Sequence, residues 1–101
     1  MSKKVTLESG RKVEIKDMSI DDVDFCNDIT TIVYDEAGGL STVKGISKAR
    51  TAWLRRGIEG GDFKNFELQG KVVSDKVIKE LTEAERNELM QLIQAHQQMG
   101  E

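Results

Sequence analysis

The sequence has few of the residues that build secreted scaffolds, membrane spans or metal sites. Its single cysteine, Cys26, excludes an intrachain disulfide and is typical of a protein from a reducing cytosol. No apolar run approaches the roughly 20 residues that a membrane-spanning helix requires. The lysines at the N-terminus are not followed by the apolar segment of a signal peptide. We therefore expect a cytoplasmic protein that does not contact a membrane.

Aromatic residues are also scarce, at 5% of the chain, and there is no proline. With so few rings, Trp53 and the three phenylalanines are expected to anchor much of the packing. A chain of 101 residues without internal repeats or a low-complexity linker is expected to form a single domain over residues 1–101.

Catalytic and metal-binding sets cannot be assembled from the residues present. His96 is the only histidine that could pair with Cys26, and Cys26 falls on the apolar stripe of a predicted helix, which favours a buried structural thiol. One cysteine and one histidine do not make a zinc site. The glycine-rich segment 59–62 lacks the phosphate-binding patterns and is interpreted as a turn. We expect no enzyme activity, no cofactor and no metal.

The first ordered element is predicted from alternation. Apolar and polar residues alternate on both sides of Gly10, which predicts a β-hairpin over residues 4–16. Folding the segment about Gly10 places Leu7 opposite Val13 and keeps one face of the hairpin apolar.

Helical periodicity accounts for most of the remaining chain. Thr82 and Glu85 form the capping-box pattern at the start of the last helix. A short strand or hairpin fits the segment 63–73. The predicted helices lie near residues 20–34, 46–57, 75–81 and 83–98. The fold class is therefore α+β and mainly helical, with an N-terminal β-hairpin packed against about three α-helices.

Charge is divided between the first two predicted helices. Residues 17–36 contain seven acids and no base, whereas residues 37–58 contain bases and no acid. Helical spacing places three of these acids on a solvent-facing side of the first helix: Asp21, Asp24 and Asp28. The second helix carries Trp53 on its apolar face with Leu54 beside it, and it supplies five bases: Lys44, Lys48, Arg50, Arg55 and Arg56. These ten residues are the candidate partner-binding residues.

Two functions are compatible with this division. The first is a charge-complementary protein contact, in which the acidic and basic helices meet a partner or a second copy of this chain, and apolar residues beside Trp53 supply binding energy. The alternative is a small nucleic-acid-binding regulator that uses the basic helix 44–56. The net charge of -3 argues against dedicated nucleic-acid binding. Protein binding is the function we expect.

The opening of the chain resembles a family of viral proteins. The hairpin V-T-L-E-S-G-R-K-V-E-I and the capped acidic segment D-M-S-I-D-D-V that follows are similar to the start of bacteriophage tail assembly chaperones. The polar C-terminal segment L-T-E-A-E-R-N-E-L also suits such a protein. The resemblance covers about the first third of the chain. It implies a non-enzymatic factor of phage morphogenesis, in the host cytoplasm, that keeps the tape measure protein soluble and recruits tail tube subunits.

Overall fold

The computed structural model of the protein describes residues 2–37 and 43–99, and for the helical residues 31–37, 43–46 and 99 it gives only the backbone path. The elements in chain order are β1 (Lys3–Thr6), β2 (Lys12–Ile15), α1 (Ile20–Ala37), α2 (Val43–Gly57), β3 (Ile58–Gly61), β4 (Leu68–Gln69), β5 (Val72–Val73), α3 (Asp75–Glu80) and α4 (Glu83–Met99). The α+β class, the N-terminal hairpin and the predominance of helix are confirmed.

The N-terminal hairpin has a register two residues away from the predicted one. Val5 pairs with Val13, and Leu7 N donates to Arg11 O at 2.8 Å. Gly10 does not sit at the centre of the turn but takes its last position, where its φ of 95° needs a residue without a Cβ. Because the shift is an even number of residues, the same side chains still face the core. Leu7 is 2% exposed and Val13 is fully buried.

The glycine-rich segment after α2 is a strand and not the predicted turn. β3 pairs antiparallel with β2 and completes a three-stranded sheet in the order β1-β2-β3. A Cβ on Gly60 would lie 2.5 Å from Glu14 Oε2, and a Cβ on Gly61 would lie 2.5 Å from Lys12 O. Gly61 therefore allows close approach to the backbone of β2, whereas at Gly60 the close atom is the end of the flexible Glu14 side chain. The sequence pattern could not separate this role from that of a chain break.

The segment 63–73, for which the sequence allowed either a short strand or a hairpin, contains a second hairpin. β4 and β5 pair antiparallel, with Leu68 opposite Val73. Gly70 has a φ of 68°, which places the left-handed residue in the turn between them. Val73 is fully buried and joins the core, whereas Leu68 is exposed.

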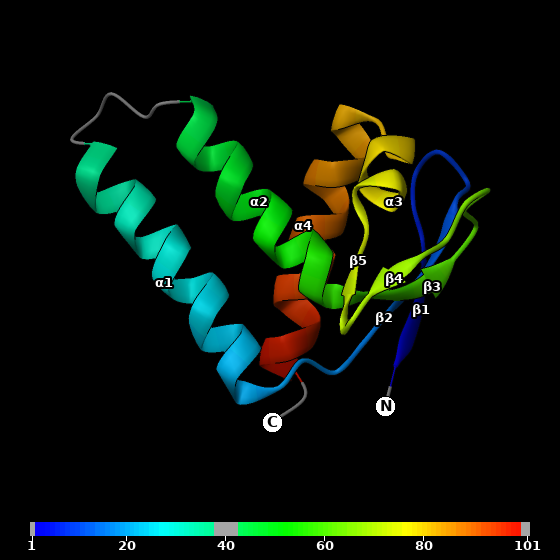
Figure 1. The fold of residues 1–101 in the computed structure, drawn as a ribbon, viewed down its shortest axis with the longest axis horizontal. Coiled ribbons are helices and arrows are strands. Elements are labelled where there is room, and N and C mark those ends of the chain that lie inside the picture. The colour runs from blue at the N-terminus through cyan, green and yellow to red at the C-terminus, as the bar shows by residue number, and fades with distance from the viewer. Residues whose placement is uncertain (1, 38–42, 100–101) are drawn as a thin grey trace.

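Helix α2 lies at the centre of the molecule (Figure 1). It packs against α1 on one side and α4 on the other, and it also contacts α3 and β5. Its only tryptophan, Trp53, is 3% exposed, and Leu54 is fully buried. Trp53 Nε1 donates to Thr30 Oγ1 at 3.2 Å, and the Thr30 hydroxyl donates to Cys26 O at 2.8 Å. The basic segment of the chain thus forms the middle of the core.

Candidate protein-binding surface

Three of the candidate residues on α2 are covered by the rest of the chain. Trp53 and Leu54 belong to the core, and Arg50 is 8% exposed. The Arg50 guanidinium donates to Asn87 Oδ1 at 2.8 Å and to Glu83 Oε1 at 2.9 Å, both on α4. A partner has no access to these side chains in this structure, so they do not form part of an exposed surface.

The next two arginines are paired inside the molecule. The Arg55 guanidinium donates to the Asp75 carboxylate at the start of α3. This hydrogen bond and the positive charge hold the pKa of Asp75 below its usual range. Arg56 Nε lies 3.5 Å from Asp22 Oδ1 on α1, and its guanidinium lies over the Phe25 ring at 4.0 Å from the centroid. Attraction between the acidic and basic helices is therefore present within one chain.

Only one base of the predicted set is described as exposed on α2. Lys48 is exposed and forms no ion pair with another described residue. The side chain of Lys44 lies outside the described residues. Within the described part of α2, the predicted basic face is therefore reduced to Lys48 and the exposed edges of two paired arginines.

The acidic face of α1 lies where the sequence placed it. Asp21, Asp24 and Asp28 are all exposed, and none of them forms an ion pair with another described residue. Ser19 Oγ accepts a hydrogen bond from Asp22 N at 3.1 Å, which confirms the N-cap geometry typical of serine. The cap fixes where α1 begins and hence which of its residues point outward.

A groove that the sequence did not predict runs between the first half of α1 and the end of α4. Its larger part has a volume of about 640 Å³, and a smaller part of about 310 Å³ continues it. Val23, Asn27 and Gln97 line both parts. The start of α1 and the end of α4 lie close together at one end of the molecule (Figure 1).

The wall of the groove is held by contacts between α4 and the segment that precedes α1. The Gln97 side-chain amide accepts a hydrogen bond from Met18 N at 2.9 Å and donates one to Lys16 O at 3.0 Å. His96 Nε2 lies 2.6 Å from Asp17 Oδ1. These partners are about 80 residues apart in the chain, and they fix the larger part of the groove before a partner is present.

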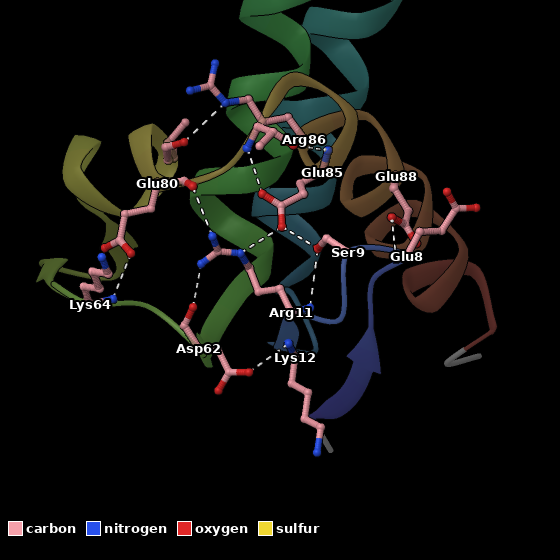
Figure 2. A network of polar contacts seen from close by, with 12 residues as sticks. Glu8, Ser9, Arg11, Lys12, Asp62, Lys64, Glu80, Glu85, Arg86 and Glu88 are labelled. Atoms are coloured by element: carbon pink, nitrogen blue, oxygen red, sulfur yellow. Dashed lines mark hydrogen bonds and ion pairs between the residues drawn. The ribbon is translucent and has the colours of Figure 1, made fainter.

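A second polar cluster lies at the opposite end of α4. The capping box is confirmed, because Thr82 N donates to Glu85 Oε1 at 2.8 Å and Glu85 N donates to Thr82 Oγ1 at 3.1 Å. The other carboxylate oxygen of Glu85 accepts from Ser9 Oγ at 2.7 Å and from Arg11 Nε at 2.9 Å (Figure 2). One side chain therefore caps α4 and fastens it to the N-terminal hairpin.

Arg11 extends this cluster to two further elements. Its guanidinium donates to Asp62 O at 2.6 Å and to Glu80 O at 3.2 Å, as Figure 2 shows. Burial raises the pKa of Glu85, but hydrogen bonds from Thr82 N and from the hairpin lower it to about 2. The carboxylate is ionised at neutral pH and engaged on both oxygens, so its role is to hold the fold together.

Groups with catalytic chemistry are not gathered in the described part of the chain. Cys26 is fully buried, and burial raises the pKa of its thiol to about 11, so it is protonated at neutral pH. Among residues 2–37 and 43–99, no three histidine, cysteine or acidic side chains are placed to hold a metal ion. No helix in these same ranges combines the length and apolar character needed to cross a membrane.

Comparison with protein-family models, curated proteins and solved structures finds no match to this chain.

Proposed function

We propose that this protein is a non-enzymatic protein–protein interaction module that binds a positively charged partner through α1. The observation that carries the proposal is the set of three exposed carboxylates, Asp21, Asp24 and Asp28, beside a groove of mixed polar and apolar lining. Ile20, at the mouth of this groove, is 79% exposed. This side chain adds an apolar contact beside the three carboxylates, and protein interfaces combine apolar contacts with a polar rim in this way.

The two parts of this surface have different tasks. The carboxylates attract a basic partner over a distance of about 10 Å at ordinary salt and orient its approach. The apolar part of the groove, formed by Met18, Ile20 and Val23, supplies contact area from which water is removed, and that is where most binding free energy is gained. Because Arg50, Arg55 and Arg56 of α2 are paired internally, α1 presents more unpaired charge than α2 does among the described residues of these two helices.

Nucleic-acid binding through the basic helix 44–56 is less well supported. Of its bases, Arg50 is buried against α4, and Arg55 and Arg56 each face a carboxylate of this chain. A phosphate would have to displace these carboxylates, which lowers the gain from each contact. The buried ring of Trp53 is not placed to stack on a base.

The biological setting we propose follows from the resemblance of the first third of the chain to bacteriophage tail assembly chaperones. In that setting the protein acts in the host cytoplasm as a morphogenesis factor. Its partner is a tail protein with a basic segment, such as the tape measure protein, or a second copy of this chain.

The proposal is tested by selecting binders from a random peptide library displayed on phage. We expect the wild-type protein to enrich peptides that combine lysine or arginine with aliphatic residues. A triple variant with Asp21→Asn, Asp24→Asn and Asp28→Asn is the counter-selection target, and circular dichroism checks that its helix content is unchanged. Loss of the basic consensus on the variant supports the proposal. An acidic consensus, an identical consensus on the variant, or no enrichment at all would overturn it.

A further inference from the structure

We propose that the groove between α1 and α4 binds one aliphatic side chain of a basic segment of the partner. The recognised sequence is an apolar residue flanked by lysine or arginine. This inference rests on the proposed function and adds a specific recognition site to it. It concerns a partner protein or peptide and not a second copy of this chain.

The groove has room for an aliphatic side chain together with the neighbouring backbone of a partner segment. Its larger part, at about 640 Å³, lies within the range of about 300–1,000 Å³ that is typical of sites for whole small ligands. Its apolar lining comes from Met18, Ile20 and Val23. The smaller part reaches Trp53, the ring at the centre of the core. An aliphatic side chain placed here would cover Ile20, the most exposed of the large apolar residues of the described chain.

The charges around the groove favour basic residues next to that aliphatic residue in the partner's sequence. Asp17 and Asp24 line the larger part, and no lysine or arginine does so among the described residues. His96 lies beside Asp17, with its Nε2 directed at the carboxylate. Asp21 and Asp28 are exposed on α1, the helix that also carries Asp24. A segment with basic residues on both sides of its aliphatic residue meets negative charge along α1, whereas an acidic segment is repelled.

The groove is also held in a fixed shape. The Gln97 side chain forms hydrogen bonds with the backbone of both Lys16 and Met18. The chain segment 16–18 beside the groove therefore does not have to be ordered when a partner binds. A preformed site avoids part of the entropy cost of association, which favours recognition of a short segment.

Asn27 is the position at which the groove can be filled without disturbing the core. Its side chain is exposed and lines both parts of the groove. In the variant Asn27→Phe an aromatic ring would occupy the space that the partner needs. The matched control is Ala95→Phe, because Ala95 is exposed on α4 and does not line the groove.

The test measures binding of two fluorescein-labelled peptides by anisotropy at low salt. The first has the sequence Gly-Lys-Lys-Leu-Lys-Lys-Gly, and the second replaces its leucine by alanine. On the wild-type protein and on Ala95→Phe, we expect the alanine peptide to bind about tenfold more weakly, as the loss of buried aliphatic groups predicts. On Asn27→Phe, the two peptides should bind with the same affinity, because the new ring takes the place of the partner's leucine side chain in the groove.

Each other outcome overturns a defined part of the account. Equal binding of both peptides to the wild-type protein, with weaker binding to the triple aspartate variant, overturns the groove site and leaves the proposed function standing. Absence of binding by either peptide, or binding that the triple variant does not weaken, overturns both. A wild-type dimer in light scattering that Asn27→Phe converts to a monomer would show that a second copy occupies the groove, and it would overturn the peptide assignment.

Discussion

Replacing Glu85 by glutamine is expected to destabilise the fold strongly at neutral pH. The carboxylate joins the start of α4 to the N-terminal hairpin through Ser9 and Arg11, and it is 5% exposed. Glutamine keeps the size of the side chain but removes its charge. It leaves the Arg11 guanidinium, whose side chain is 23% exposed, without its ionised partner.

The size of the effect follows from the pKa of Glu85. A fall from 4.5 to about 2 on folding corresponds to roughly 3 kcal/mol of stability, at about 1.36 kcal/mol per pKa unit. Because the pKa in the folded state is lower than in the unfolded state, this stability is fully present above pH 4.5. It is lost as the pH falls from about 4.5 toward 2. We expect Glu85→Gln to lower the free energy of unfolding by about 2–3 kcal/mol at pH 7 and by progressively less below pH 4.5.

Urea denaturation at several pH values measures this difference. Trp53 is the only tryptophan and is buried, so its fluorescence reports the loss of the core directly. The matched control is Glu88→Gln on the same helix, whose carboxylate accepts a hydrogen bond from Glu8 N at 3.2 Å and forms no ion pair with another described residue. The reasoning is refuted if Glu85→Gln and Glu88→Gln cost the same at pH 7, or if the cost of Glu85→Gln does not change with pH.

Three further predictions concern single side chains. Gly57→Ala should lower the free energy of unfolding by about 1–3 kcal/mol in urea, because the new Cβ would lie 2.6 Å from Ile93 Cγ2; unchanged stability would show that the contact yields easily. Cys26 should react with a thiol reagent only as fast as the native fold opens, since it is buried and its pKa is about 11, and reaction at the rate of the unfolded chain would contradict this. Arg50→Met should cost about 1–2 kcal/mol in thermal or urea unfolding, whereas the exposed Lys48→Met should change stability by less than about 0.5 kcal/mol; equal effects would refute the different environments of the two bases.

Local patterns in the sequence were sufficient to predict the presence of the helices and of the first hairpin, but not the register of the hairpin. The capping box of Thr82 and Glu85 and the serine cap of α1 act over three residues, so the pattern that forms them is visible in a short window. Apolar periodicity placed Cys26 in the core and the three candidate aspartates of α1 in solvent for the same reason.

Features that depend on contacts between distant residues could not be predicted in this way. Strand β3 pairs with β2, and Gly61 fits closely against the backbone of Lys12 and Val13, which lie more than 40 positions earlier in the chain. The arginines of α2 have the spacing of a basic surface. Their partners on α3 and α4, Asp75 and Glu83, follow about 20–30 residues later and neutralise them.

The candidate site was also predictable only where it depends on local sequence patterns. Asp21, Asp24 and Asp28 were predicted from helix geometry alone and are exposed as expected. The groove beside them is closed on one side by His96 and Gln97, which belong to the last helix, and no local pattern connects these to the segment before α1. The charge of the surface was predictable, and its shape was not.

The most direct test of the central claim, that the acidic side of α1 binds a basic partner, is the salt dependence of the dissociation constant of the leucine peptide. For the wild-type protein we predict binding that weakens steadily as salt is raised from 20 to 300 mM, because salt screens the exposed carboxylates. The triple variant with Asp21→Asn, Asp24→Asn and Asp28→Asn should bind more weakly and show little dependence on salt. Equal affinity and equal salt dependence in the two proteins would contradict the claim.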